Sequence, residues 1–394
     1  MEPSEGKKLN FNNTEIAFRH KSKSELNSAY WLFKIMGSNF LTQVGPPITN
    51  LFLNIGLPIQ GLIKATIFKQ FCGGETIAEC ERTIAQLATA KVGTILDYSV
   101  EGEDEESVFD FTCEEIIRTI DRAAGDPRIP ITVFKITGIG RFGLLEKLDA
   151  NQELSVEELA EFEKVKTRCE RICRTAFEKD VPVMIDAEET WIQKTIDELA
   201  LKMMMLFNKE KLIVYNTYQL YRHDKLADLK ADHLVAKETG FILGAKIVRG
   251  AYMEKERRRA LQMGYPSPIQ PDKTSTDQDY NAALVYCIEH IHEVGIVCGT
   301  HNEASCKLLA ELLDQHKVDH NHPHVYFSQL LGMSDNLSFN LSDAGYNVAK
   351  YVPYGPVKAV MPYLFRRAQE NTSIAGQTSR ELDLIEREKK RRNS

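Results

Sequence analysis

Short apolar runs alternate with longer amphipathic stretches along most of the chain after about residue 90. Eight of these runs have the length of strands. They are residues 92–99, 131–137, 181–188, 212–219, 241–250, 295–302, 324–332 and 348–355. Because the runs are apolar on both faces and lie between helix-sized segments, they predict strands of a parallel sheet that is covered on both sides.

The segments between the runs have the apolar spacing of amphipathic helices. They are residues 113–124, 156–179, 191–208, 223–239, 280–294, 303–316 and, after the last run, 357–369. Eight strand–helix units predict the α/β class and a closed (β/α)8 barrel of the TIM type. An open doubly wound sheet is the alternative, but no GxGxxG turn follows the first strand.

Helical periodicity also dominates the chain before the first strand, at residues 24–40 and 76–90, and Thr76 is placed to cap the second helix. We therefore predict a helical N-terminal arm at 1–90, the barrel at 91–375, and a charged tail at 376–394 that frays from residue 386 onward. Residues 149–160 resemble a calcium loop but lack its Gly and Glu, so Ser155 and Glu158 are interpreted as a capping box.

The charge balance limits the possible partners. The 394 residues include 49 basic and 56 acidic side chains, a net charge of -7. This balance argues against a nucleic-acid binder that works through a general basic field. The eight cysteines are expected to be reduced thiols of the core, and no metal site is predicted.

The first residues, Met1 to Lys8, have no features of a secretory signal, so we expect an intracellular compartment. The most apolar stretch, 48–68, is interrupted by Pro58, Gly61 and Lys64. We interpret it as a buried or surface-docking helical segment, although its length raises a membrane helix as the alternative.

The active site of such a barrel lies at the carboxyl ends of its strands. Lys135 lies near the end of the second strand, where a buried lysine needs a carboxylate partner. Asp186, at the end of the third strand, is one available partner, and a bound acidic substrate is another. A barrel ion pair without chemistry is the structural alternative.

The fifth strand ends in Lys246 and Arg249, followed by Gly250 and Ala251. Small residues allow a ligand to approach the backbone, and the cations would suit a cofactor that bears phosphate. The alternative is a tight turn flanked by solvent-exposed cations. At the end of the sixth strand, His301 is the histidine of greatest interest.

Arg366 and Arg367 lie in the helix after the last strand. Their long side chains could form paired, fork-type hydrogen bonds with one carboxylate. However, Glu370 lies four residues after Arg366 and could instead be its partner within the helix.

Taken together, these strand ends resemble the proline dehydrogenase family, over about residues 92–371. The resemblance rests on an ordered set of motifs spread over the strands. They are FKIT (134–137), VMIDAE (183–188), KIVRGAY (246–252), THN (300–302), QLLGM (329–333), YVPYG (351–355) and YLFRRAQEN (363–371).

The resemblance implies a distorted barrel that binds FAD and oxidises L-proline to Δ1-pyrroline-5-carboxylate by hydride transfer to the flavin. Electrons would pass on to a membrane quinone. It implies a substrate site that contains Lys135, Asp186, Tyr351, Arg366, Arg367 and Glu370. The implied flavin site contains Ala187, Gln219, Lys246, Arg249, Gly250, Ala251, Tyr252, Thr300, His301 and Asn302.

In this resemblance, Arg366, Arg367 and Lys135 bind the proline carboxylate, and Tyr351 packs on the substrate ring. Lys246 stands where many bacterial members have Arg, an exchange typical of the animal branch. The hydroxyproline-preferring branch has a small Ser in place of Tyr351, so we expect proline to be preferred. The alternatives are a hydroxyproline dehydrogenase or an inactive barrel that acts as an interaction protein.

The resemblance also implies partners. The chain lacks the length for a fused aldehyde dehydrogenase, so we expect pyrroline-5-carboxylate dehydrogenase to be a separate polypeptide. The compartment would be the bacterial cytoplasm and inner membrane surface, or the mitochondrial matrix and inner membrane. Delivery of electrons to a lipid-soluble quinone suggests peripheral membrane contact through 48–68 or the basic tail.

Overall fold

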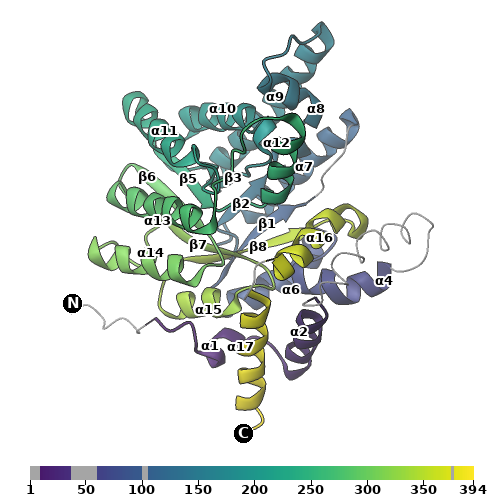
Figure 1. Ribbon diagram of the computed structural model, residues 1–394, viewed down its shortest axis with the longest axis vertical. Helices are drawn as coiled ribbons and strands as arrows, with labels where there is room; N and C mark the ends of the chain where they lie inside the picture. The colour runs from purple at the N-terminus through teal and green to yellow at the C-terminus, as the bar shows by residue number, and fades with distance from the viewer. Residues whose placement is uncertain (1–8, 37–59, 100–104, 374–376) are drawn as a thin grey trace. The chain divides into compact units, whose positions relative to one another are not determined.

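Eight parallel strands follow one another in chain order around a closed barrel (Figure 1). The structure, a computed structural model, describes residues 9–36, 60–99, 105–373 and 377–394. The strands are β1 (Gly93–Tyr98), β2 (Ile131–Phe134), β3 (Val183–Ile185), β4 (Val214–Gln219), β5 (Leu243–Val248), β6 (Val294–Gly299), β7 (Val325–Leu330) and β8 (Val348–Tyr354). Each lies within one of the eight apolar runs or extends it by one residue, so the predicted (β/α)8 class is confirmed.

Helices precede, connect and follow these strands. Along the chain they are α1 (Thr14–Phe18), α2 (Lys23–Met36), α4 (Gln60–Ile63), the π-helix η1 (Lys64–Phe68), α5 (Lys69–Phe71), α6 (Ile77–Ala88), α7 (Glu106–Ala123), the 3-10 helix η2 (Ile136–Gly138), α8 (Phe142–Asp149), α9 (Val156–Lys179), α10 (Thr190–Phe207), α11 (Lys225–Thr239), α12 (Met253–Met263), α13 (Lys273–Glu289), α14 (Glu303–Gln315), α15 (Asp335–Asp343), α16 (Val357–Ser373) and α17 (Gln377–Arg391). Figure 1 shows α10, α11 and α13 on the outside of strands β3–β6. The sequence pattern did not predict α8, α12 or α15.

Two predicted helix caps are confirmed. The Thr76 side chain accepts a hydrogen bond from the backbone N–H of Glu79 at 3.2 Å and begins α6. Ser155 and Glu158 form a complete capping box at the start of α9. Asp149, which resembled a calcium ligand, instead accepts hydrogen bonds from the backbone N–H groups of Lys194 and Thr195 in α10.

The chain forms two compact units: residues 1–101 with 329–394, here called the terminal unit, and 102–328, here called the central unit. The division into arm, barrel and tail at 90 and 375 stays a proposal. In the central unit, parallel registers join β2 through β7, with Val183 opposite Val214 and Leu243 opposite Val294. In the terminal unit, β1 pairs with β8, and Ile95 lies opposite Tyr351.

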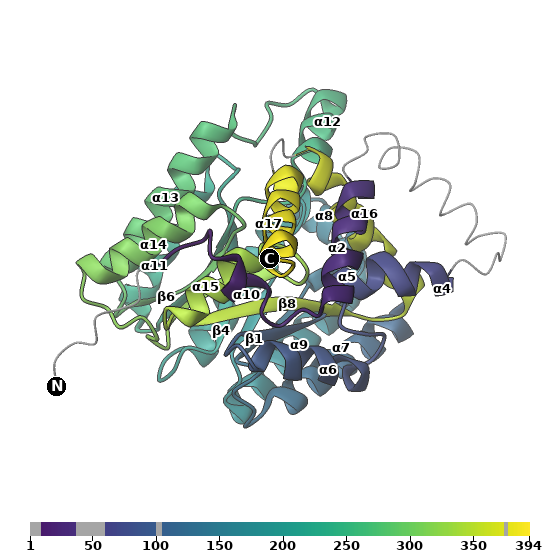
Figure 2. The same ribbon diagram turned by 90° about the horizontal axis from the view of Figure 1, so that it is seen from below.

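The terminal unit has its own apolar core, in which α2 and α17 lie side by side (Figures 1 and 2). Leu26 and Phe33 from α2 meet Leu384 and Ile385 from α17 in this core. The expectation that the chain frays from residue 386 onward is therefore wrong. Glu388 is buried in α17 and binds Arg391 and Arg392, because the charged pattern is one face of an amphipathic helix.

A buried group of charges surrounds Asp335, at the start of α15. Lys350, from β8, donates to its carboxylate at 2.9 Å, and Lys21 lies 3.2 Å away. Lys350 also donates to the carbonyls of Leu330 and Met333. Burial alone would raise the pKa of Asp335, but Lys21, Lys350 and His20 together lower it below its usual range.

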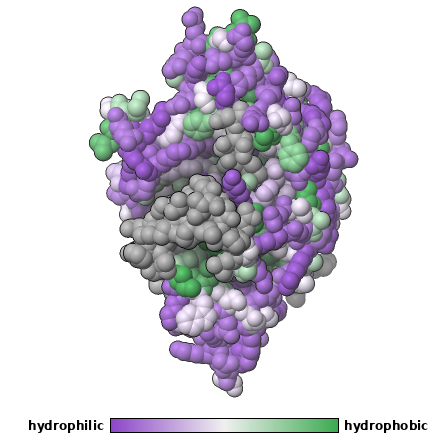
Figure 3. Space-filling model, turned by 90° about the vertical axis from the view of Figure 1, so that its right-hand side faces the viewer, coloured by the Kyte–Doolittle hydropathy of each residue, from purple (hydrophilic) through white to green (hydrophobic). Residues whose placement is uncertain are grey.

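All eight cysteines are free and buried, which confirms the prediction of reduced core thiols. Within the described ranges, no helix is long and apolar enough to cross a membrane. Most of the segment 48–68 lies outside those ranges, and its last residues form α4 and η1. On the face drawn in Figure 3, the residues that are not grey are mainly hydrophilic, with scattered apolar ones.

The replacement Glu381→Gln should change how stability depends on pH. Burial first, and the nearby Asp335 next, raise the pKa of Glu381 to about 7. The folded protein therefore holds this proton more tightly than the unfolded chain, and the resulting stabilisation is lost as pH rises from about 4.5 to about 7. The glutamine side chain of this variant can still accept the hydrogen bond from the Ser334 N–H, which is 2.5 Å long.

Thermal unfolding measured from about pH 5 to about pH 8 tests this expectation. As pH increases, the melting temperature of Glu381→Gln should rise relative to that of the unmodified protein. The corresponding change in the free energy of unfolding is at most on the order of 3 kcal/mol. Glu386→Gln, which alters an exposed glutamate of the same helix, is the matched control and should follow the unmodified protein. A constant difference between Glu381→Gln and the unmodified protein would contradict the assignment.

Candidate active site

Two lysines share one carboxylate: Lys135, just after β2, and Lys246, within β5. Asp186 follows β3, and its Oδ1 accepts a hydrogen bond from Lys246 Nζ at 2.6 Å. Lys135, directly after β2, places its Nζ 4.0 Å from Asp186 Oδ2. Of the two partners that the sequence offered for Lys135, Asp186 is the one that the structure places beside it, and Lys246 is closer to the same carboxylate. Two cations and one carboxylate leave an excess positive charge there, which favours an anionic ligand.

Lys246 is buried within the barrel wall. It is 6% exposed and lies in the middle of β5, opposite Thr217 of β4 and Val297 of β6. The alternative of solvent-exposed cations is therefore wrong for Lys246. A buried ammonium is costly without a partner, and Asp186 supplies that partner.

Arg249, just beyond β5, is fixed by three protein partners. It donates to Asp277 Oδ1 at 2.8 Å, to Thr300 Oγ1 at 2.8 Å and to Ser305 Oγ at 2.9 Å. Its guanidinium also lies over the Tyr280 ring, 4.2 Å from the centroid. Arg249 thus ties the end of β5 to α13 and to the first turn of α14.

Sequence reasoning did not identify Asp277 or Ser305 as partners of Arg249. Helical periodicity placed 303–316 in a helix but did not indicate which residue of its first turn faces inward. The expected helix at 280–294 begins instead at Lys273, because the Asp272 side chain accepts from the Ser275 N–H and caps it. Asp277 therefore lies in the first part of α13, which the predicted helix at 280–294 did not include.

Both the backbone conformation at position 250 and the adjacent Tyr221 ring require a glycine there. Its φ is +125°, and an added Cβ would overlap the ring of Tyr221. Ala251 is exposed and Tyr252 is half-buried, so both follow the turn toward solvent. The group that closely approaches Gly250 in the structure is the Tyr221 ring, and the approach of a ligand there stays a prediction.

Thr300, His301 and Asn302 follow β6 in sequence. The Thr300 hydroxyl accepts from Arg249 and also from the Asn302 backbone N–H at 3.0 Å. The Asn302 side chain accepts from the Ser305 N–H at 3.0 Å and caps α14. His301 lies between these two residues and is half-buried.

Gln219 ends β4 and is 2% exposed. Its Nε2 donates to the backbone carbonyl of Glu188 at 2.9 Å. Its Oε1 is buried and has no hydrogen-bond partner among the described residues. Ala187, between Asp186 and Glu188, is half-buried. An unmatched buried acceptor on the strand next to Lys246 is expected where a polar ligand completes the site.

The remaining predicted residues belong to the terminal unit and are described within it. Tyr351 is buried in β8, where its carbonyl accepts from the Leu331 N–H. Arg367, in α16, is 6% exposed and lies over the Tyr363 ring at 5.1 Å. Arg366 is half-buried. The side chain of Glu370 lies outside the described residues, so its predicted pairing with Arg366 stays a prediction.

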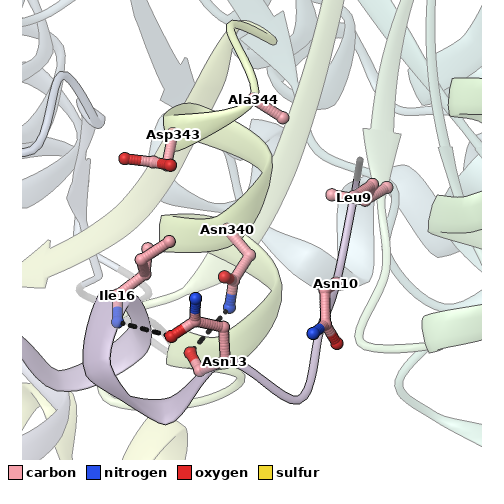
Figure 4. Close-up of a pocket in the computed structure, with 7 residues that line it drawn as sticks. All are labelled: Leu9, Asn10, Asn13, Ile16, Asn340, Asp343 and Ala344. Carbon is pink, nitrogen blue, oxygen red and sulfur yellow. Dashed lines mark hydrogen bonds between the residues drawn. The ribbon is translucent and has the colours of Figure 1, made fainter. Parts of the chain in front are cut away.

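A pocket of the terminal unit is a different feature. It lies between α1 and α15 (Figure 4) and is lined by Leu9, Asn10, Asn13, Ile16, Asn340, Asp343 and Ala344. Its asparagines bind the backbone: Asn13 accepts from the Ile16 N–H, and Asn340 donates to the Asn13 carbonyl. None of the predicted site residues lines it.

Comparison with solved structures supports the fold. The chain superimposes with a TM-score of 0.73 on proline utilization A (PutA) from Bdellovibrio bacteriovorus, inactivated by N-propargylglycine. The match covers 94% of this chain but only 40% of that one, at 20% identity. This likeness therefore concerns the fold alone.

Curated relatives are more similar in sequence. Proline dehydrogenase 1, mitochondrial, of Dictyostelium discoideum is 34% identical over 96% of this chain and 74% of its own length. The Caenorhabditis elegans protein of the same name is 39% identical, and the match covers 66% of this chain and 43% of that protein. Hydroxyproline dehydrogenase of Xenopus laevis is 30% identical over 84% of this chain and 78% of its own.

A protein-family model also matches most of this sequence. A family model described as proline dehydrogenase matches residues 80–380, which is more than half of the chain. The matched range contains every predicted site residue, including the Lys135, Asp186 and Lys246 group. On these similarities, the chain belongs to the proline dehydrogenase family of oxidoreductases.

Proposed function

We propose that this protein uses FAD to oxidise L-proline to Δ1-pyrroline-5-carboxylate and passes the electrons to a membrane quinone. The observation that carries the proposal is the group formed by the buried Lys246 of β5 and the half-buried Asp186 and Lys135, which directly follow β3 and β2. Family membership supports proline as the substrate.

The central unit offers a polar environment that fits a flavin. The unmatched Oε1 of Gln219 could accept a hydrogen bond from a ring N–H, and the Lys246 ammonium is held in place by Asp186. The remaining proposed flavin-binding residues lie at neighbouring strand ends: Ala187, Arg249, Gly250, Ala251, Tyr252, Thr300, His301 and Asn302. Bound FAD would supply the hydride acceptor, which no amino-acid side chain provides.

Lys246 would stabilise negative charge that arrives in the site during proline oxidation. A fixed cation in a water-poor site is effective because it need not reorganise during the reaction. Asp186 keeps Lys246 and Lys135 in place and partly neutralises both. Lys246 is a point charge where Arg would offer a planar fork, so its role is electrostatic and not bidentate.

The substrate carboxylate would be bound by Arg366 and Arg367 with help from Lys135, and Glu370 would orient the arginines. Arg367 is buried, so its charge is poorly screened by water and its attraction for a carboxylate is strengthened. Tyr351 would pack against the proline ring. With its carboxylate bound by cations, the substrate keeps its nitrogen free to lose a proton.

Hydroxyproline is the second candidate substrate, because the Xenopus laevis relative carries that name. The bulky, buried Tyr351 favours proline, since a 4-hydroxyl group would need space and a polar partner near the ring. An inactive barrel is disfavoured by the intact arrangement of Lys135, Asp186 and Lys246.

We propose a location at the inner face of a respiratory membrane. The Dictyostelium discoideum relative is named as mitochondrial, which supports the mitochondrial alternative. A membrane quinone as acceptor, peripheral membrane contact, and a separate pyrroline-5-carboxylate dehydrogenase complete the proposal.

An anaerobic visible spectrum before and after addition of L-proline tests the function directly. The purified protein should show a flavin band that bleaches with proline. Bleaching by 4-hydroxyproline alone would favour the second substrate. A protein that stays colourless after reconstitution with FAD would contradict the proposed activity.

Arg367→Met should raise the KM for proline by about 10- to 100-fold, because it removes charge-assisted hydrogen bonds to the carboxylate. Steady-state kinetics with an artificial electron acceptor measure this effect. Arg258→Met, which removes an exposed arginine of α12, is the control and should leave KM unchanged. Equal KM values in the two variants would exclude Arg367 from carboxylate binding.

Tyr351→Ser should shift selectivity toward 4-hydroxyproline. The smaller, polar side chain frees space and offers a hydroxyl partner, so the ratio of kcat/KM for 4-hydroxyproline to that for proline should rise about tenfold. Competition between the two substrates measures this ratio. A fall of both values by the same factor would show that Tyr351 does not select the ring substituent.

A further inference from the structure

Glu188 is a buried carboxyl group to which the proposed reaction assigns no role. It lies two residues after Asp186, between β3 and α10, and is 3% exposed. Its Oε1 accepts a hydrogen bond from the backbone N–H of Thr137 at 3.1 Å. Its Oε2 accepts a second hydrogen bond, from the Thr137 hydroxyl. The Glu188 carboxyl group thus accepts hydrogen bonds from both the backbone N–H and the hydroxyl of Thr137.

Thr137 is the central residue of the short helix η2, which begins directly after Lys135. Within this turn, the Gly138 N–H donates to the Lys135 carbonyl at 3.1 Å. Glu188 adds an anchor from the end of β3 to this turn, which directly follows Lys135. A small shift of such a turn is enough to misplace the ammonium at the end of the Lys135 side chain.

The main chain of Glu188 has contacts of a different kind. Its carbonyl accepts from Gln219 Nε2 at 2.9 Å, which fixes the amide whose Oε1 has no partner among the described residues. Its N–H donates to Gln193 Oε1 at 2.7 Å, and Gln193 Nε2 donates to Asp197 at 2.8 Å. The backbone of residue 188 is therefore held independently of its side chain.

The electrostatic surroundings agree with a carboxyl that is kept for its geometry. Burial raises the pKa of Glu188 to about 8, while the Thr137 donors and the charge of Lys135 oppose that rise. Such a group is costly to bury as an anion. Two nearby donors and a lysine offset part of that cost.

We propose that Glu188 is a positioning residue for substrate binding: its carboxyl fixes the turn after Lys135, while its carbonyl separately fixes Gln219 on the flavin side. This inference rests on the proposed function, because Lys135 and Gln219 are assigned there to proline and flavin. It predicts that changes to the Glu188 side chain affect the substrate side and spare the cofactor side.

The variants Glu188→Ala and Glu188→Gln distinguish effects on substrate binding from effects on flavin binding. Glu188→Ala should raise the KM for proline about tenfold, change kcat less than about threefold, and leave the flavin content and visible spectrum unchanged. Glu188→Gln can still accept from the Thr137 N–H, and its amide can donate to the Thr137 oxygen. It should therefore restore KM to within about threefold of the unmodified value.

Thr137→Val tests the contact itself. It removes the hydroxyl but keeps the N–H, so its KM should rise less than that of Glu188→Ala. The double variant should show no further rise beyond Glu188→Ala, because both changes break one interaction. Glu189→Gln is the matched control, since that neighbouring carboxylate pairs with Lys255 and takes no part in the contact between Glu188 and Thr137.

A ligand that cannot be oxidised keeps the two hypotheses distinguishable. Cyclopentanecarboxylate has the ring and the carboxylate but no amine, and its Kd can be titrated through the flavin spectrum. Failure of the unmodified protein to bind it and to be bleached by proline would refute the proposed function. A functional unmodified protein whose Glu188→Ala variant keeps both KM and this Kd, or loses flavin in parallel, would overturn the positioning role.

Discussion

The ion pair between Lys246 and Asp186 is the interaction on which the candidate site depends. Neither group could be buried alone at small cost, so the position of each requires the other. The 2.6 Å hydrogen bond joins β5 to the end of β3, and Lys135 brings the end of β2 to the same carboxylate. One acidic side chain therefore sets the spacing of two cations that serve different ligands in the proposed reaction.

Around this pair, the loops after β5 and β6 are anchored to each other by side-chain hydrogen bonds. Arg249 is held by Asp277, Thr300 and Ser305, and the hydroxyl of Thr300 is also bound by the N–H of Asn302. A site built this way is rigid before any ligand enters, which reduces the entropy cost of binding.

Much of the fold could be predicted from the sequence, because strands covered on both faces give unambiguous apolar runs. The helices α8, α12 and α15 were missed: they are short and lie in segments to which the pattern assigned no element. The fraying predicted for the tail was wrong for a related reason: Leu384 and Ile385 lie among many charges, and only the apolar surface that they contact reveals their role. The sequence offered Asp186 as one of two possible partners of Lys135. It could not indicate that Lys246 lies closer to Asp186 or that Glu188 accepts hydrogen bonds from Thr137, because these distances arise from the strand register.

Lys350 has a consequence for the neighbouring Tyr351. Successive residues of a strand point to opposite faces, so the anchoring of Lys350 by Asp335 and two carbonyls also fixes the backbone that presents Tyr351. The strand cannot slip or rotate to fill space at residue 351 without breaking a buried ion pair. A smaller side chain there would leave a cavity of defined shape, so in the proposed reaction the substrate repertoire could change through a single residue while the framework stays fixed.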